Sequence, residues 1–170
     1  MRAGIALGSN LGNRLDHLQS ARADLARLAI AGSTVLSSPV YETPPVDCPP
    51  GSPAFLNAVV ELDWDGSPAS LLEHTQGIEF RHGRRRRGGE TNAPRTLDLD
   101  ILYAGDSRID TPGLSLPHPR IASRRFVLQP LADLRPALRL PGFSVTIRRL
   151  LTILESGSPE DGPRLVARVW

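Results

Sequence analysis

The sequence contains no lysine, and all 20 of its basic residues are arginine. Its single cysteine, Cys48, excludes an internal disulfide framework and fits a reducing compartment. Aromatic residues make up only 5% of the chain. No apolar run approaches the roughly 20 residues of a membrane-spanning helix, and the apolar stretch after Met1 is too short for a signal sequence. These absences predict a cytoplasmic protein without a membrane anchor.

The length of 170 residues favours one domain, residues 1–170, which is large enough to bury a hydrophobic core without disulfides or structural metals. The formal net charge is only +2, but half of the arginines fall between residues 81 and 125. Such clustering indicates a local anionic partner rather than a uniformly basic surface.

The segment from Arg84 to Asp100 combines four successive arginines with a D-L-D motif. Side chains alternate along a strand, so Asp98 and Asp100 are expected on the same face. Two carboxylates so placed suit Mg²⁺, which takes one or two of them and completes its shell with water and phosphate oxygens. Arginine binds phosphate bidentately. A four-arginine run by itself is more often a solvated loop or a nonspecific polyanion patch than a site, but its combination with the D-L-D motif indicates a nucleotide triphosphate site.

The hydrophobic pattern predicts alternating strands and helices. Strands are expected over 3–7, within 34–43, over 55–62 and over 98–103. A helix should begin after the N-cap Asn13 and close at Gly32, with its apolar face formed by Leu15, Leu18, Leu25 and Leu28. A second helix should run from Ser67-Pro68 to about Arg81. Residues 106–117 read as irregular, helices are expected from about 124 and over 147–154, and the last dozen residues carry little signal.

The strand over 55–62 should present two different faces. Leu56, Ala58, Val60 and Leu62 form the apolar one, and Phe55, Asn57, Val59 and Glu61 form the other. The order of elements is βαββαβ followed by helical additions. It predicts an α+β ferredoxin-like sandwich with a mostly antiparallel sheet.

Six motifs in order resemble one known family. They are G-S-N-L-G-N from Gly8, V-Y-E-T-P-P from Val40, F-L-N-A from Phe55, H-T-Q-x-I-E from His74, P-R-T-L-D-L-D-I-L from Pro94, and L-P-H-P-R from Leu116, which is followed by Arg124 and Phe126. Together they closely resemble 6-hydroxymethyl-7,8-dihydropterin pyrophosphokinase, a folate-pathway enzyme family, over roughly residues 3–135. The family has the ferredoxin-like fold that the order of elements predicts.

The resemblance implies transfer of pyrophosphate from the co-substrate ATP to the hydroxymethyl group of a reduced pterin, with release of AMP. It implies catalytic roles for Arg84, Arg95, Asp98 and Asp100, with two Mg²⁺ ions held by the two aspartates. ATP would contact Gln76, Arg84, Arg86, Arg95, His118 and Arg124, and the backbone of Ile101 near its adenine. The pterin would contact Thr43, Pro45, Val46, Phe55, Asn57 and Phe126. The enzyme is expected to be a monomer that acts on small molecules, without nucleic-acid or membrane partners.

The residues themselves agree with these roles. Stacking of a pterin on Phe55 and Phe126 would contribute about 1–3 kcal/mol per ring face, by analogy with nucleobases. The Asn57 amide offers both a donor and an acceptor to the mixed edge of a pterin. The two phenylalanines could also be core residues, and His118 could be a simple turn residue. Glu79 is expected to orient an arginine rather than to touch substrate, and no residue stands out as a general base.

Two alternatives remain open at this point. A nucleic-acid-binding module using Arg84 to Arg87 would show strongly salt-dependent affinity, but the exposed aromatics of a single-strand platform are scarce. A pterin-binding relative with weakened catalysis is the other, because Thr91-Asn92 stand where the family often has Arg-Trp. The intact D-L-D motif argues against the second alternative.

Overall fold

A computed structural model describes residues 1–84, 93–157 and 162–170. Its elements in chain order are β1 Arg2–Ser9, α1 Arg14–Leu28, β2 Leu36–Ser37, β3 Val40–Thr43, β4 Phe55–Asp63, α2 Pro68–Arg81, β5 Asp98–Ala104, β6 Ile109–Thr111, β7 Leu114–Leu116, the 3₁₀ helix η1 Ile121–Ser123, α3 Arg125–Leu134, α4 Ile147–Gly157 and β8 Arg164–Ala167. Among the described residues, no helix is long and apolar enough to cross a membrane.

The main sheet has the strand order β5-β1-β4-β3-β8, and β2 also pairs with β4. Each of these pairs is antiparallel. The first four strands in that order are the fourth, first, third and second strands of the βαββαβ unit, which is the arrangement of a ferredoxin-like sheet. The predicted fold class is therefore confirmed.

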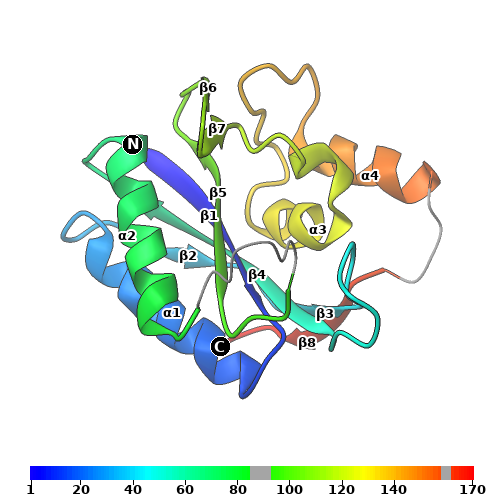
Figure 1. The fold of residues 1–170 in the computed structure, drawn as a ribbon. Helices are drawn as coiled ribbons and strands as arrows, with labels where there is room; N and C mark the ends of the chain where they lie inside the picture. The colour runs from blue at the N-terminus through cyan, green and yellow to red at the C-terminus, as the bar shows by residue number, and fades with distance from the viewer. Residues whose placement is uncertain (85–92, 158–161) are drawn as a thin grey trace.

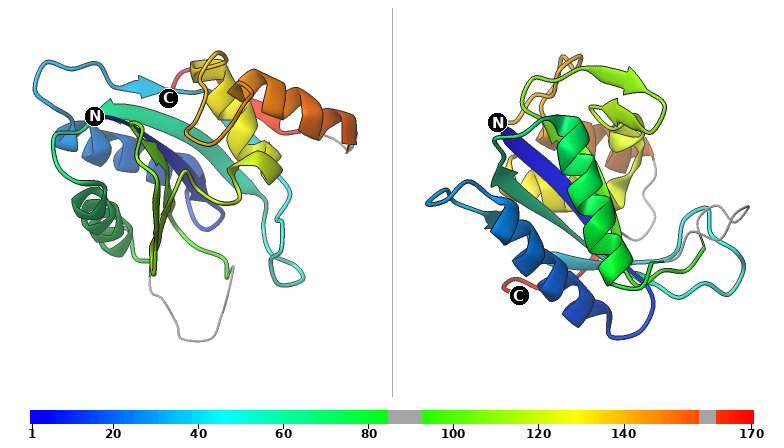
Figure 2. Two further views of the ribbon diagram at one scale, coloured as in Figure 1. Left: turned by 90° about the horizontal axis from the view of Figure 1, so that it is seen from above. Right: turned by 60° about the vertical axis from the view of Figure 1, so that its left-hand side comes forward.

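Helices cover both faces of this sheet (Figures 1 and 2). Helices α1 and α2 pack on one face, where Leu18, Leu25, Leu71 and Ile78 belong to the first hydrophobic core. The additional helices α3 and α4 lie on the other face and form a second core with strand residues. The site described below lies on the face that carries α3.

Strand β4 shows how the two layers divide its side chains. Leu56, Ala58, Val60 and Leu62 join the first core, as the alternation predicts. Val59 belongs to the second core, and Asn57 and Glu61 are buried polar residues. Phe55–Leu62 is buried throughout because helices or loops cover both faces.

The strand register brings chemically important residues into one row. Gly8 of β1 lies opposite Asp98 of β5 on one side and opposite Asn57 of β4 on the other. Asn57 in turn lies opposite Tyr41 of β3. Residues directly opposite one another share a face of the sheet, so the D-L-D motif and the F-L-N-A motif face the same space.

The first helix differs from the prediction at both ends. Asn13 occupies the N-cap position, but its side chain makes no capping bond and donates to the Asp16 carboxylate instead. The helix ends at Leu28 rather than near Gly32. The reason is tertiary: the Ile30 N–H donates to the Asp63 carbonyl at 3.0 Å, which draws the chain out of the helix toward β4.

Two short strand regions contradict the sequence-based expectation. Residues 109–116 form the β6–β7 hairpin, although 106–117 read as irregular. Strand β8 pairs with β3 at the sheet edge, although the last dozen residues gave no pattern. Both regions are too short for an alternation to stand out. The helix from Ser67-Pro68 is confirmed: the Ser67 hydroxyl accepts from the Ser70 N–H, and Pro68 occupies the first turn.

Candidate active site

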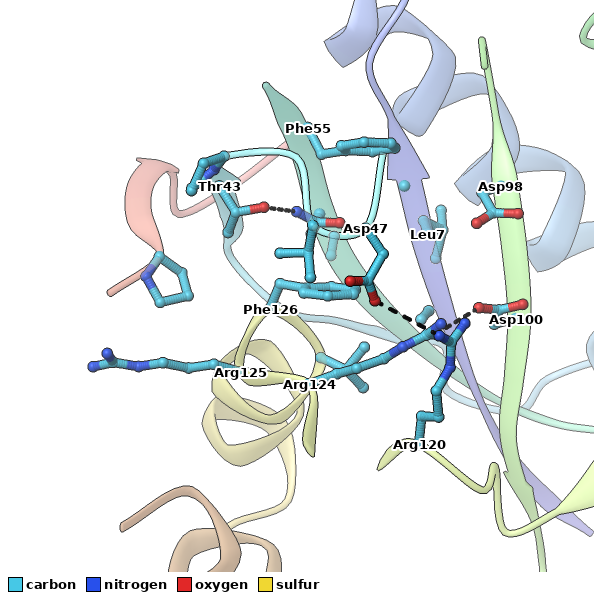
Figure 3. A pocket seen from close by; sticks show the side chains of 18 of the residues that line it. Leu7, Thr43, Asp47, Phe55, Asp98, Asp100, Arg120, Arg124, Arg125 and Phe126 are labelled. Atoms are coloured by element: carbon cyan, nitrogen blue, oxygen red, sulfur yellow. Dashed lines mark hydrogen bonds and ion pairs between the residues drawn. The ribbon is translucent and has the colours of Figure 1, made fainter. Parts of the chain in front are cut away.

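A cavity of about 430 Å³ lies over the sheet and continues from β5 to the β3–β4 loop (Figure 3). Its volume is in the range of pockets that hold small molecules. Nine residues predicted to bind substrates or metal line it: Thr43, Val46, Phe55, Asn57, Arg95, Asp98, Asp100, Arg124 and Phe126. The structure thus brings most of the predicted site together.

One end of the cavity carries both aspartates of β5, each paired with arginine. Arg95 Nη2 lies 2.8 Å from Asp98 Oδ2, and Arg84 Nη1 lies 2.5 Å from Asp98 Oδ1. Arg124 Nη1 lies 3.2 Å from Asp100 Oδ2. Each of these charged groups therefore has a counter-charge within the described site.

Glu79 at the end of α2 positions this group from behind. Its Oε1 accepts a hydrogen bond from the Leu99 N–H at 2.7 Å and pairs with Arg84. Because Leu99 lies between the two aspartates, Glu79 fixes both the strand that bears them and the arginine beside them. Burial raises the pKa of Glu79. The prediction that Glu79 orients an arginine is consistent with this geometry.

The protonation of Asp98 and His118 is shifted by their surroundings. Burial raises the pKa of Asp98, and the negative charge of Asp100 raises it further, while Arg95 and Arg84 oppose the shift. Burial lowers the pKa of His118. The neutral ring agrees with its contact, because His118 Nδ1 accepts a hydrogen bond from the Arg120 N–H at 3.1 Å. His118 Nε2 lies 4.0 Å from Asp100 Oδ2.

The other end of the cavity is aromatic and amide-lined. Phe55 and Phe126 lie one above the other across it (Figure 3). Asn57 lines the same cavity, and its amide donates to the Thr43 hydroxyl at 2.8 Å, which fixes the orientation of a buried amide. The resulting slot suits a flat heteroaromatic ring with mixed donors and acceptors.

Two cation–π contacts connect the ends of the cavity. The Arg95 guanidinium carbon lies 5.6 Å from the centre of the Phe55 ring, and that of Arg124 lies 5.6 Å from the centre of the Phe126 ring. Each aromatic wall therefore adjoins an arginine that also faces an aspartate. A ligand stacked in the slot would have its edge beside this cationic group.

Gly8 forms the floor between the two ends. A side-chain carbon built on it would lie 3.5 Å from Asn57 Oδ1 and 3.7 Å from Asp98 Cβ. A methyl group would just fit, but a larger side chain would fill the space between the amide and the carboxylate. The glycine thus keeps the two ends continuous.

Asn10, in the same motif as Gly8, has a positioning role that the sequence did not reveal. Its Oδ1 accepts from the Arg95 N–H at 2.7 Å, and its Nδ2 donates to the Pro53 carbonyl at 3.2 Å. It is almost completely buried. The motif had indicated only a turn, whereas Asn10 connects the loop before Asp98 with the loop before Phe55.

Other cavity-lining residues were also missed. Asp47 and Arg120 face one another at the mouth, with Oδ2 and Nη1 4.0 Å apart (Figure 3). Arg120 belongs to the L-P-H-P-R motif, which could have suggested it, but no signal marked Asp47. Arg125, Leu154 and Pro163 line the cavity as well, and the last two lie outside the motifs.

Some predicted residues lie apart from the cavity wall. The Ile101 side chain is buried on the opposite face, in the core beneath α1 and α2, and the contact predicted for this residue is one of its backbone. Gln76 is exposed on α2. Pro45 does not line the described cavity, although Pro44 and Val46 do. Arg86 lies outside the described residues, as do Thr91 and Asn92.

The donor set is compatible with magnesium. No group of three or more His, Cys, Asp or Glu residues that could hold a metal occurs within the described parts of the chain. Asp98 and Asp100 supply two carboxylates to the cavity, which is the number Mg²⁺ usually takes when phosphates and water complete its octahedron. The residues therefore fit a metal that arrives with a polyphosphate rather than a closed protein cage.

The comparisons with known proteins agree with this geometry. Residues 4–136 match the family model described as 7,8-dihydro-6-hydroxymethylpterin-pyrophosphokinase (HPPK). A Pseudomonas aeruginosa relative named 2-amino-4-hydroxy-6-hydroxymethyldihydropteridine pyrophosphokinase is 44% identical over 142 residues, covering 82% of this chain and 84% of the relative. A Bacillus subtilis relative of the same name is 46% identical over 132 residues, covering 76% and 75%.

Solved structures show a similar fold at low identity. The Plasmodium falciparum HPPK-DHPS wild type with pteroate has a TM-score of 0.70 and 16% identity, covering 94% of this chain. This chain spans only 43% of the length of that protein. At this identity the likeness supports the fold alone.

Proposed function

This chain belongs to the 7,8-dihydro-6-hydroxymethylpterin-pyrophosphokinase family, and we propose that its cavity transfers pyrophosphate from MgATP to 6-hydroxymethyl-7,8-dihydropterin. The products would be AMP and the pterin diphosphate. Membership makes it an ATP-dependent pyrophosphokinase of folate biosynthesis. The proposal assigns the two ends of the cavity to the two substrates.

A single observation carries this assignment: one cavity joins an aspartate–arginine end to an aromatic–amide end. Carboxylates with arginines suit a metal-bound triphosphate. Stacked phenylalanines with a fixed amide suit a pterin. A protein that bound only a triphosphate would not need the aromatic end, and one that bound only a pterin would not need the aspartates and arginines. A reaction between ATP and a pterin requires both ends.

The chemistry is a displacement at phosphorus. The oxygen of the pterin hydroxymethyl group forms a bond to the β-phosphorus of ATP. The bond from that phosphorus to the oxygen bridging the α- and β-phosphates breaks, so that AMP leaves with this oxygen. The hydroxyl proton is released to solvent, and no side chain is nominated as its acceptor. Such transfers depend mainly on positioning and charge stabilisation.

The arginines of the site would supply that stabilisation. Arg84, Arg95 and Arg124 pair with Asp98 or Asp100 in the structure. When a triphosphate occupies this end, the guanidiniums can turn to its oxygens. His118 is placed beside Asp100, on the same side as Arg124, and we assign it to the nucleotide with Arg124. Arg86 and Gln76 stay predictions as further ATP contacts.

Two Mg²⁺ ions would be held by Asp98 and Asp100, and would supply charge neutralisation of the polyphosphate and polarisation of its phosphorus. The carboxylates are freed for this role as the arginines turn to phosphate. Phe55 and Phe126 would hold the pterin ring, and Asn57 with Thr43 would bind its polar edge. Glu79 and Asn10 position the site without touching substrate.

We further propose that the protein acts as a cytoplasmic monomer, folded as one domain, without nucleic-acid partners. Both ends of the proposed site come from one chain, which supports a monomer. The nucleic-acid alternative is not favoured, since the described arginines Arg84, Arg95 and Arg124 are engaged by carboxylates. The other alternative, a pterin-binding relative with weakened catalysis, is also not favoured, because Asp98 and Asp100 suit a magnesium site.

The test is direct. The purified protein is incubated with MgATP and 6-hydroxymethyl-7,8-dihydropterin, and the nucleotide products are separated by chromatography. Formation of AMP in step with pterin diphosphate is expected. Formation of ADP, or no turnover with fully reduced pterin, would refute the proposal.

A further inference from the structure

The pterin end of the cavity is closed by parts of the chain that lie beyond the family match, which ends at residue 136. Leu154 of α4 and Pro163, just before β8, both line the cavity. Neither residue belongs to the motifs of the proposed active site. The C-terminal part of the chain therefore contributes to the space that the substrate would occupy.

The strand order shows which end of the cavity Pro163 closes. The cavity begins at β5 with Asp98, crosses β1 and β4, and reaches Thr43 on β3. Strand β8 is the next strand after β3, with Arg164 opposite Glu42. Pro163 precedes Arg164 directly, so it lies beside Thr43 and farthest from the aspartates.

The C-terminal segment is anchored at its far end. The indole N–H of Trp170 donates to the Ser38 carbonyl at 2.6 Å, and the Trp170 side chain is buried in the first core. The Arg22 guanidinium carbon lies 4.9 Å from the centre of its ring. Strand β8 is thereby pinned to the start of β3, although its own side chains are mostly exposed.

Arg125 connects the near end of the segment to α4. Its Nη2 lies 3.0 Å from Glu155 Oε1, next to Leu154. The same guanidinium lies against Gly162, where a side-chain carbon would stand 2.7 Å from Nη2. Arg125, which itself lines the cavity, therefore holds α4 and the residue before Pro163 together. The absence of a side chain at Gly162 permits this approach.

We propose that Leu154 and Pro163 are specificity-determining residues that close the pterin pocket against substituents at the 2-amino end of the substrate. The inference rests on the proposed function. Positions 2 and 6 lie at opposite ends of the fused pterin ring. With the 6-hydroxymethyl group toward the triphosphate at Asp98 and Asp100, the 2-amino group points toward Thr43 and this wall. The Leu154 and Pro163 side chains are apolar and line the cavity, and the contacts of Arg125 and Trp170 hold their segments in place, so these two residues discriminate by shape.

Kinetics with two substrates test the proposal. AMP formation is measured with 6-hydroxymethyl-7,8-dihydropterin and with its 2-N-ethyl analogue, for the wild type, Leu154→Ala and the control Ile153→Ala. Ile153 is adjacent on α4 and 52% exposed. Leu154→Ala should raise the KM for the natural pterin about tenfold, as expected for lost contacts in an apolar pocket. It should leave the KM for ATP within about twofold and reduce discrimination against the analogue by about tenfold.

The outcomes separate this inference from the function on which it rests. A wild type that forms no AMP refutes the proposed function. If the wild type is active, two results refute only the role of Leu154 and Pro163. One is that Leu154→Ala discriminates against the 2-N-ethyl analogue as strongly as the wild type does. The other is that Leu154→Ala raises the KM for ATP as much as the KM for the pterin. Should Leu154→Ala fail to fold, Leu154→Val provides the same test with a smaller change. Trp170→Ala should likewise raise only the pterin KM, whereas Val169→Ala, at a position 91% exposed, should change neither.

Discussion

Replacing Asp98 with asparagine should abolish most AMP formation while preserving the fold. The amide has the size of the carboxylate but removes one negative charge from the end of the cavity where Asp98 meets Arg84 and Arg95. A unit charge about 4 Å from another, at an effective dielectric constant of about 20, contributes about 4 kcal/mol. Lost from the transition state, this corresponds to about a thousandfold in rate.

The stability of Asp98→Asn follows from the direction of the Asp98 pKa. Burial, and then the charge of Asp100, raise that pKa. A carboxyl group of this kind contributes stability that is complete below its unfolded pKa of about 3.9 and is lost as pH rises through the folded value. At a pH above the folded value this contribution is gone, so there the Tm of the variant should equal or exceed that of the wild type.

Both quantities can be measured on the same preparations, by AMP release under saturating MgATP and by thermal unfolding. Asp106→Asn is the matched control, because Asp106 is an exposed carboxylate just beyond the opposite end of β5. Turnover of Asp98→Asn within tenfold of the wild type would contradict the metal assignment. A Tm lower by more than about 8 °C, which exceeds the shift for 1 kcal/mol in a domain of this size, would contradict the electrostatic reasoning.

Three further predictions concern other parts of the site. Phe126→Leu should raise the pterin KM at least fivefold, since stacking contributes about 1–3 kcal/mol. The control Phe80→Leu, at an exposed position, should leave the pterin KM unchanged. Equal effects of the two substitutions would argue against stacking. Thr43→Val removes the acceptor of the buried Asn57 amide, at a cost of about 1–3 kcal/mol, and should raise the pterin KM. Thr43→Ser keeps the hydroxyl and should have the pterin KM of the wild type. A raised KM in Thr43→Ser would argue against a role for this hydrogen bond. Because burial lowers the pKa of His118, its stabilisation should be present above about pH 6.5 and lost as pH falls through the folded value. The difference in urea midpoint between wild type and His118→Gln should therefore shrink from pH 7.5 to 5.0, and a constant difference would show that His118 is not the titrating group.

The central strands could be predicted, and most of the predicted site residues line one cavity, because the sequence pattern and the motifs agree there. Leu56, Ala58, Val60 and Leu62 enter the first core while Val59 enters the second. Asp98 and Asp100 both line the cavity. Prediction failed where tertiary contacts decide. Strand β8 has an exposed, patternless sequence and exists through its pairing with β3 and the burial of Trp170.

Site residues were missed for a similar reason. Asn10 contacts Arg95 and Pro53, which are far from it in the sequence, and an asparagine in a turn gives no hint of such partners. The alternation of β5 also changes near its end. Ile5 pairs with Ile101 and Gly4 with Tyr103, so Leu102 is skipped and both Leu102 and Tyr103 enter the second core.

The register between strands, rather than spacing along the chain, determines how the two substrates would meet. Asp98, Gly8 and Asn57 occupy one row on three adjacent strands. Two strand spacings, about 10 Å, separate the backbone of Asp98 from that of Asn57, and this span suits a bicyclic ring held between its reacting group and its polar edge. Shifting β5 by one residue against β1 would turn Asp98 and Asp100 to the face covered by α1 and α2. The cavity would then keep its aromatic slot and lose its carboxylates, so the proposed catalysis requires the pairing of Gly8 with Asp98 as much as it requires the aspartate itself.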